Sequence, residues 1–391
     1  MARDQALLEK AWHEAARASW LLTAPNPRVG ALALAQGHVI GYGHHAVYGG
    51  SHAEEAALRD AGAWDEEQNR ARPGVVDEVV VTLEPCSATG KKRPPCTQAL
   101  LDAGVRRVVC AATDPDPRHQ GAGLRVLEEA GVEVVQAEAS EASARFAALN
   151  PAFLRGLQHP ERPWVLLKWA ASLDGKLAAD DGTSQWITGP DARAEVHALR
   201  ACSDAVAAGA GTLRADNPSL DARPQDGPPR LRQAAPTRQP LRVLVGGGDA
   251  VHADARIFAG EAARLWVLDP EQEPAAALMQ HQDPILRVAR GQQGLDLAAV
   301  LQALREQSGV RRLLVEGGAR LHGSLLAAGL VDAVVRYEAP ILLGGGRAAC
   351  AGPSFASPQM ALQLTMPEER GWGAELRRAF LVAPSEGENA R

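Results

Sequence analysis

The sequence predicts two α/β domains arranged one after the other. Its 391 residues are enough for two ordinary domains. Strand and helix signals alternate in two separate series, as in sheets covered by helices. Between the series lies "NPAFLRGLQHPERPW", residues 150–164, whose proline and polar content is typical of a domain boundary. We therefore expect one domain over residues 1–150 and a second over residues 160–385.

The composition indicates a soluble globular protein. Hydrophobic residues make up 46% of the chain and charged residues 23%. A net charge of −6 provides no cationic surface for nucleic acid or an anionic membrane. No apolar run approaches the roughly 18 residues of a membrane helix, and the amphipathic start does not resemble a signal peptide. We expect a cytoplasmic protein that forms a homo-oligomer, a dimer or tetramer, as two-domain α/β enzymes commonly do.

The first series of elements is defined by apolar spacing and by glycines that end helices. A helix is expected over about residues 4–20, because Leu7, Trp12 and Ala16 recur at helical spacing. The elements that follow are two strands in "VGALALAQGHVIGYGHH" with a turn at Gly37, a helix in "HAEEAALRDAG", a strand "EVVVTL", a helix "CTQALLDAG", a strand "VRRVVCAA", a helix "GAGLRVLEEAG" and a strand "VEVV". This order predicts a mainly parallel sheet with helices on both faces.

The second series begins after residue 164. Strands are expected in "WVLLKWAAS", "DAVAAG", "LRVLVG", "ARLWVL", "RRLLVEGG" and "VDAVVRYEAPILL", with helices at about 190–202, 296–307 and 319–328. The stretch "RPQDGPPRLRQAAPTRQP" has the composition of a surface loop.

Three residues of the first series have the types that bind zinc. His52 and Cys96 each begin an expected helix, and Cys86 follows the end of a strand. Zinc is held by nitrogen and sulfur ligands, and a catalytic zinc keeps one position open. Helix starts favour thiolates, and strand ends of an open sheet are where ligands bind. The three residues therefore predict a catalytic site for one Zn²⁺ per chain.

Glu54 lies in the first helical turn after His52, close to the expected metal. A carboxylate there can take a proton from a metal-activated water and return it to a departing amine. His-x-Glu followed by Pro-Cys and a further Cys is the pattern of zinc deaminases. Two alternatives remain at this point: a purely structural zinc, which typically has four ligands, and no metal at all.

Glycine turns after strands are the main signal in the second series. Gly-x-Gly-x-x-Gly has no good match, so a standard dinucleotide fold is not indicated. Instead, "AAGAGTLRADNP", "LVEGGARLHGS" and "LLGGGRA" each place glycines after a strand. Such turns let backbone N–H groups approach phosphates at helix starts, although each can equally be an ordinary turn or cap.

Together these motifs resemble the bifunctional riboflavin-biosynthesis deaminase–reductase family over nearly the whole chain. The deaminase half is matched in order by "PNPRVG", "GHVIGYGHH", "SHAEEAAL", "TLEPCS…PPCTQALLDAGVRRVV" and "DPDPRHQGAGLRVLEEAG". The reductase half is matched by "KWAASLDGKLA", "GTSQWITGPDARAEVHALRACSDAVAAGAGTLRADNPSL" and "LLVEGGARLHGSLLAAGLVDAVVRYEAPILLGG". The resemblance implies a cytidine-deaminase-like α/β/α sandwich followed by a dihydrofolate-reductase-like α/β domain.

For the deaminase half, the resemblance implies hydrolysis of the amino group of a pyrimidine ribosylamino 5′-phosphate. It assigns zinc to His52, Cys86 and Cys96 and the proton shuttle to Glu54. The substrate-binding residues it implies are Asn26, His45, Lys91 and Lys92. Three features depart from the family pattern: nine residues rather than eight separate the cysteines, Ala88 replaces a histidine, and Asp116 replaces an asparagine.

For the reductase half, the resemblance implies reduction of the ring-opened ribose by NADPH. The implied NADPH positions are Ala170, Trp186, Thr212, Asp216, Gly247 and the run Gly318, Ala319, Arg320, Leu321, His322, Gly323 and Ser324. The implied substrate positions are Lys168, Ser184, Arg200, Leu220, Arg223 and Glu316. Among these, Arg200 and Arg223 can hold the substrate phosphate. Of all these positions, Lys168 and Asp216 are the expected catalytic residues, and Gly246 replaces the aspartate that the family has after the strand.

Two other functions remain possible from the sequence. The first is a nucleoside or tRNA deaminase with an accessory nucleotide-binding domain, which the acidic net charge disfavours. The second is a zinc-stabilised scaffold or sensor that binds a pyridine nucleotide without catalysis.

Overall fold

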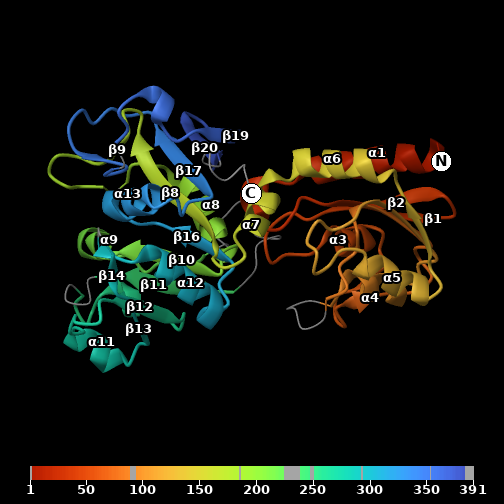
Figure 1. Ribbon diagram of the computed structural model, residues 1–391, viewed down its shortest axis with the longest axis horizontal. Helices are drawn as coiled ribbons and strands as arrows, with labels where there is room; N and C mark the ends of the chain where they lie inside the picture. Colours follow the sequence, from red (N-terminus) through yellow and green to blue (C-terminus); the bar gives the residue numbers. More distant parts are fainter. Residues whose placement is uncertain are drawn as a thin grey trace. The chain divides into compact units, whose positions relative to one another are not determined.

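A computed structural model of the chain describes residues 2–88, 94–184, 186–223, 238–246, 251–291, 294–352 and 354–383 (Figure 1). The chain divides into two compact units, Met1–Leu157 and Gln158–Arg391. The division falls within the expected boundary at 150–164. About half of that stretch forms a helix, α7 (Pro151–Gln158). Its first residue is a proline, which is favoured at the first position of a helix.

The first unit is built on a five-stranded sheet in the order β2-β1-β5-β6-β7. Its strands are β1 (Gly30–Ala35), β2 (His38–His44), β5 (Glu78–Leu83), β6 (Arg107–Ala112) and β7 (Glu133–Gln136), and a separate pair is formed by β3 (Trp64–Asp65) and β4 (Arg70–Ala71). The expected turn is present, with Gly37 at a positive φ of 84°. The expectation of a mainly parallel sheet is wrong for β1, which runs antiparallel to both neighbours. A tight hairpin connects it to β2 and makes that pair antiparallel. Only β5, β6 and β7 are parallel.

Helices cover both faces of this sheet (Figure 1). One face packs against α1 (Ala2–Arg17) and α6 (Ala139–Leu149), and the other against α3 (Ala53–Asp60), α4 (Cys96–Asp102) and α5 (Ala122–Glu129). The first helix ends at Arg17, before the expected residue 20. Ser19 caps a separate short helix, α2 (Trp20–Thr23), by accepting a hydrogen bond from the Leu22 N–H.

The second unit contains a nine-stranded sheet in the order β13-β12-β11-β10-β16-β8-β17-β20-β19. Its strands are β8 (Trp164–Ser172), β10 (Ala205–Gly209), β11 (Leu241–Val245), β12 (Arg264–Leu268), β13 (Ile285–Arg287), β16 (Arg312–Val315), β17 (Ala333–Ala339), β19 (Leu364–Trp372) and β20 (Glu375–Val382). The helices are α8 (Pro190–Ala201), α9 (Ala210–Asp216), α11 (Ala276–His281), α12 (Leu297–Ser308) and α13 (Ala319–Ala327), with 3-10 turns η2 (Arg256–Phe258) and η3 (Pro358–Met360). Two short ladders, β9 (Lys176–Ala178) with β18 (Arg347–Ala348) and β14 (Arg290–Gly291) with β15 (Gly294–Leu295), lie outside the sheet.

Both expected domains are therefore α/β, and the expected fold class is confirmed. The three expected helices of the second unit match α8, α12 and α13 to within about one residue. The expected strand "VDAVVRYEAPILL" stops at Ala339, and β13 and the β19–β20 pair were not expected. Strand β20 alternates in burial and pairs antiparallel with β17, which short-range patterns do not reveal. Among the described residues, no helix is long and apolar enough to cross a membrane.

Close packing of α3 against β2 requires glycine in the strand. A Cβ atom at Gly43 would overlap the Ala53 carbonyl oxygen and the Ala57 nitrogen, and Gly41 lies equally close to the same helix. The helix that carries the His52 and Glu54 positions can lie this near the sheet only because these two side chains are absent.

Replacing Gly43 by alanine should destabilise the first unit by about 1–3 kcal/mol, because the added carbon forces α3 away from the sheet. The measurement is the midpoint of thermal unfolding of the full chain, followed together with zinc release. Tyr42→Thr is the matched control, since Tyr42 is exposed on the opposite face of the same strand. An unchanged midpoint for Gly43→Ala would contradict the packing described here.

Candidate functional site

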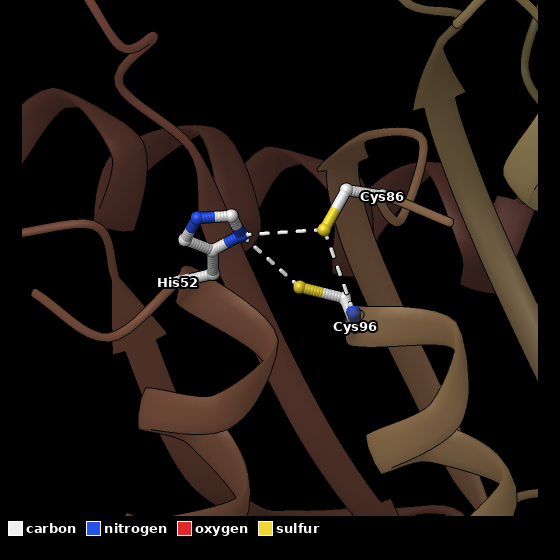
Figure 2. A group of neighbouring side chains, drawn as sticks. All are labelled: His52, Cys86 and Cys96. Carbon is white, nitrogen blue, oxygen red and sulfur yellow. Dashed lines mark hydrogen bonds between the residues drawn. The ribbon is translucent and has the colours of Figure 1, made fainter. Parts of the chain in front are cut away.

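Three side chains of the first unit converge on one point (Figure 2). His52 is the cap residue of α3, Cys86 follows β5, and Cys96 is the first residue of α4. The Nδ1 atom of His52 lies 3.2 Å from the Cys96 sulfur and 3.6 Å from the Cys86 sulfur. The backbone N–H of Cys96 donates a hydrogen bond to the Cys86 sulfur at 3.4 Å, which favours a thiolate there.

The spacing of these atoms fits zinc. Tetrahedral zinc, with bonds of about 2.0–2.3 Å, separates its ligand atoms by about 3.6–3.8 Å. The ligand atoms of His52, Cys86 and Cys96 all lie within 4.8 Å of one another. Within the described ranges, no fourth histidine, cysteine or carboxylate joins the group, so one tetrahedral position is available to a water or substrate.

Glu54 lies beside this group in the first turn of α3 and is 4% exposed. Burial raises the pKa of Glu54 to about 7, against the opposing effect of His52. A carboxyl group whose pKa lies near neutrality both accepts and donates protons readily, as a proton shuttle must. Glu54 lies next to the metal-binding residues and is not one of them, and its role as the proton shuttle stays a prediction.

Asn26 and His45 adjoin the same site. His45 is buried, and its Nδ1 lies 2.8 Å from the Ser51 carbonyl oxygen, to which it must donate. In the neutral ring, Nε2 is then an acceptor, and the Asn26 amide donates to it at 3.2 Å. This bond orients the Asn26 carboxamide, whose oxygen can accept a hydrogen bond from a ligand. The ring of His45 also packs edge-on against His52, with centroids 5.4 Å apart.

Glu84, which precedes Pro-Cys in the deaminase pattern, is a buried residue of the site to which the sequence analysis assigned no role. Its carboxylate accepts hydrogen bonds from the N–H groups of Asp114 at 3.0 Å, Gly121 at 2.7 Å and Gly123 at 3.1 Å. These bonds attach the loop after β6 to the strand end that carries Cys86. The position before Pro-Cys was the only signal in the sequence, and a glutamate there has no distinctive spacing.

The loop held by Glu84 carries one of the departures from the family pattern. Asp116 is 5% exposed, and its carboxylate accepts hydrogen bonds from Nε and the terminal nitrogen of Arg118. The Arg118 guanidinium holds the pKa of Asp116 well below its usual range. Lys91 and Lys92 lie outside the described residues.

The second unit contains a cavity of about 1230 Å³ at the carboxyl ends of its parallel strands. Most of the positions that the sequence analysis assigned to this unit line it: Lys168, Ala170, Ser184, Trp186, Arg200, Thr212, Asp216, Leu220, Arg223, Glu316, Gly318, Ala319, Arg320, Leu321 and Ser324. His322 and Gly323 lie on the covered side of α13, where a Cβ at Gly323 would overlap the Ala351 carbonyl oxygen. Gly247 is not among the described residues.

A buried carboxylate organises one end of the cavity. Glu316, just after β16, accepts hydrogen bonds from Nε of Arg200 at 2.5 Å and from Nζ of Lys168 at 3.3 Å. Burial alone would raise the pKa of Glu316, but Arg200 and Lys168 outweigh it and hold that pKa well below its usual range. Arg200 also donates to a second oxygen of Glu316 at 3.0 Å and to the Asp221 carbonyl oxygen at 2.9 Å. Most N–H donors of Arg200 are therefore occupied within the protein.

His197, on α8, is a second group that the sequence analysis missed, and it is partly buried. Arg223 donates to its Nε2 at 2.9 Å, and its Nδ1 lies 3.2 Å from the Asp221 carbonyl oxygen and 3.3 Å from the backbone nitrogen of Arg223. Burial, and then Arg200 and Arg223, lower the pKa of His197 to about 4. His197 is therefore neutral at physiological pH and holds Arg223 beside the cavity.

Two helix starts face the cavity. Helix α9 follows β10 and α13 follows β16, and these parallel strands are neighbours. A Cβ at Gly318 would lie 3.5 Å from the Thr212 hydroxyl, so the two turns nearly touch. By contrast, the amides of Gly344 and Gly346 in the third glycine stretch are bonded to Asp174 and Asp180. That stretch is a turn in which the protein's own carboxylates already bind these backbone amides.

Comparison with known proteins identifies relatives of both units. The family model "RibD C-terminal domain" matches residues 163–373, and "Cytidine and deoxycytidylate deaminase zinc-binding region" matches residues 1–112. The chain is 40% identical over 359 residues to the riboflavin biosynthesis protein RibD of Corynebacterium ammoniagenes, covering 90% of this chain and 92% of the relative. It is 35% identical over 362 residues to the Escherichia coli protein of that name, covering 90% and 93%.

Solved structures agree with these matches. Form 1 of Acinetobacter baumannii RibD superposes with a TM-score of 0.70 at 32% identity, covering 98% of this chain and 99% of that chain. A Thermotoga maritima diaminohydroxyphosphoribosylaminopyrimidine deaminase/5-amino-6-(5-phosphoribosylamino)uracil reductase has a TM-score of 0.65 at 27% identity, with the same coverage.

Purified protein should contain one zinc per chain, and Cys96→Ser should lose most of it, because three ligands leave little redundancy. Glu54→Gln should retain the metal, since Glu54 is not one of the converging ligands. Elemental analysis after dialysis against a weak chelator measures both. Full zinc retention by Cys96→Ser would show that the metal is held elsewhere.

Glu316→Gln should destabilise the second unit by about 3–5 kcal/mol at pH 7, because Arg200 and Lys168 lose their buried counter-charge. The folded pKa of Glu316 is lowered, so its stabilising effect is present above its unfolded pKa of about 4.3 and is lost as the pH falls towards the folded value. Denaturant unfolding of both proteins at pH 7 and near pH 3.5 should therefore show a smaller difference in acid. A difference that grows in acid would have the wrong sign.

Proposed function

This chain belongs to the RibD family of bifunctional riboflavin-biosynthesis deaminase–reductases, and on that premise we propose the reaction of each unit. The first unit hydrolyses the amino group of 2,5-diamino-6-ribosylamino-4(3H)-pyrimidinone 5′-phosphate and releases ammonia. The second unit then reduces the ribosyl group of that product with NADPH to give 5-amino-6-(5-phosphoribitylamino)uracil. One observation carries the proposal. The buried Glu54, whose pKa is raised to about 7, lies beside three side chains that can bind one metal ion.

In the deamination, His52, Cys86 and Cys96 would hold the zinc, which would act as a Lewis acid that activates water. Glu54 takes a proton from the attacking water and passes it to the departing amino group, which leaves as ammonia. Asn26, oriented by His45, hydrogen-bonds the pyrimidine. The hydrogen bonds of Glu84 hold the loop after β6 against the strand end that carries Cys86.

In the reduction, the cavity holds the nucleotide and the sugar together. NADPH would supply the hydride, with its phosphates at the starts of α9 and α13. Lys168, positioned by Glu316, donates a hydrogen bond to the sugar oxygen on which negative charge develops. Asp216 accepts a hydrogen bond from the Ser184 hydroxyl at 2.7 Å and so orients Ser184 for the substrate.

Arg223 is better placed for the substrate phosphate than Arg200. The sequence analysis assigned the phosphate to both, but Arg200 is largely engaged by Glu316 and the Asp221 carbonyl. Arg223 has a 41% exposed side chain and is held by the neutral His197.

Homo-oligomer formation and a cytoplasmic location stay predictions from the sequence.

The two reactions should be separable by single substitutions. Glu54→Gln should lower ammonia release by about 10²–10⁴-fold, the usual contribution of acid–base catalysis, while leaving NADPH oxidation with the deaminated product unchanged. Lys168→Met should do the reverse, because it removes the donor to the sugar oxygen. Each variant thus serves as the folding control for the other.

The outcome also separates this proposal from the alternatives. A non-catalytic scaffold would be indifferent to Glu54→Gln. Release of ammonia from cytidine or tRNA, but not from the pyrimidine ribosyl phosphate, would refute the proposed substrate.

A further inference from the structure

Helix α3 starts beside the metal-binding residues, and a metal-binding side chain takes its cap position. His52 is the cap residue, but its imidazole is turned to the sulfur atoms of Cys86 and Cys96 (Figure 2). A typical cap residue instead uses its side-chain oxygen to accept a hydrogen bond from a backbone N–H of the first turn. The chain that enters this helix therefore has to be fixed by another group.

Glu55, the third residue of α3, provides that group. It is 7% exposed, and its Oε1 accepts a hydrogen bond from the Ser51 hydroxyl at 2.9 Å. In a capping box, the glutamate at this helix position reaches back to the cap residue itself. Here the glutamate reaches one residue further, to Ser51. Its negative charge is also favourable in the first turn of a helix.

Arg59 holds Glu55 in this orientation. It lies one turn later on α3, and its Nε donates to the same Glu55 oxygen at 3.0 Å, with Nη2 at 2.9 Å. The Arg59 guanidinium is itself fixed, because it lies 4.7 Å from the ring centroid of Trp64 and pairs with Glu66. The Glu55 carboxylate therefore cannot turn away from Ser51 without breaking an ion pair.

The Ser51 carbonyl extends this order to the substrate side of the site. Nδ1 of His45 lies 2.8 Å from that oxygen, and the Asn26 amide lies 3.2 Å from Nε2 of the same ring. The backbone N–H of His45 also donates to the Val29 carbonyl oxygen at 3.0 Å, which joins the residues before β1 to those after β2. A displacement of Ser51 would therefore turn the His45 ring, and the Asn26 carboxamide with it.

We propose that Glu55 is a positioning residue for the deamination. It acts through Ser51 and His45, whose arrangement sets the direction of the Asn26 carboxamide. The inference rests on the proposed function, in which Asn26 binds the pyrimidine. Glu55 lies outside the metal-binding group, and its carboxylate is directed to Ser51 and Arg59. Its loss should therefore weaken pyrimidine binding and leave proton transfer by Glu54 in place.

The test measures ammonia release from the pyrimidine ribosyl phosphate by the zinc-loaded full chain. Ser51→Ala and Glu55→Ala should each raise KM by about 3- to 10-fold, the usual effect of one hydrogen bond, with kcat within about twofold of wild type. Glu55→Gln should keep a KM close to that of wild type, because its amide oxygen can still accept from the Ser51 hydroxyl. Ser51→Ala leaves the charge of Glu55 in place, so it separates the hydrogen bond from any effect of that charge.

A double variant tests whether Glu55 acts through Asn26. If it does, adding Glu55→Ala to Asn26→Ala should raise KM little further. Asp60→Ala is the matched control, because its carboxylate ties the other end of α3 to the Tyr42 N–H at 2.8 Å. It should lower the midpoint of thermal unfolding without changing KM. Fully additive effects of Glu55→Ala and Asn26→Ala would show that Glu55 supports only the helix, and would overturn the inference.

A second measurement does not depend on the substrate. Nitrogen-15 NMR spectra of the imidazole rings, with His45 assigned from a His45→Asn variant, report which ring nitrogen carries the proton. His45 should be protonated at Nδ1 alone in wild type and should populate both tautomers in Ser51→Ala and Glu55→Ala. An unchanged His45 spectrum in both variants would overturn the inference, whatever happens to KM. If wild type releases no ammonia from this substrate, the proposed function fails, and the ring spectra still decide whether Glu55 positions His45.

Discussion

Parallel strands must end together at one edge of a sheet, and this constraint places the chemical groups of both units. In the first unit, Cys86 follows β5 while Glu84 ties in the loop after the neighbouring β6. In the second, β8, β10, β11 and β16 open onto the cavity. Helices that begin after such strands direct backbone N–H groups towards the same edge, which favours thiolates and phosphates there.

Three buried glutamates show how partners decide the state of one side-chain type. Glu54 lies beside the metal-binding side chains, and its burial there raises its pKa to about 7. Glu316 is equally buried but faces Arg200 and Lys168, so it stays ionised. Glu84 is surrounded by backbone N–H donors and serves as an anchor. The first can transfer protons, the second orients a lysine, and the third fixes a loop.

Much of the metal site could be predicted from the sequence because its chemistry requires specific residue types. His52, Cys86 and Cys96 are recognisable from type and spacing, and the structure places them together. Glu84 and His197 could not be found in this way. Their roles depend on which backbone groups and side chains meet them, and those partners lie up to 39 residues away for Glu84. Arg200 was assigned to a phosphate because its pairing with Glu316, 116 residues away, is invisible in the local pattern.

The sequence alone determined the alternation of elements, the metal-binding residue types and the glycines at helix ends, because these depend on interactions between near neighbours in the chain. Only the tertiary structure decided that β1 runs antiparallel to β5, that β19 and β20 complete the second sheet, and that His322 packs inside while its neighbour Leu321 lines the cavity. These outcomes depend on which distant segments pair and which face of a helix is covered. Local propensity does not encode either choice.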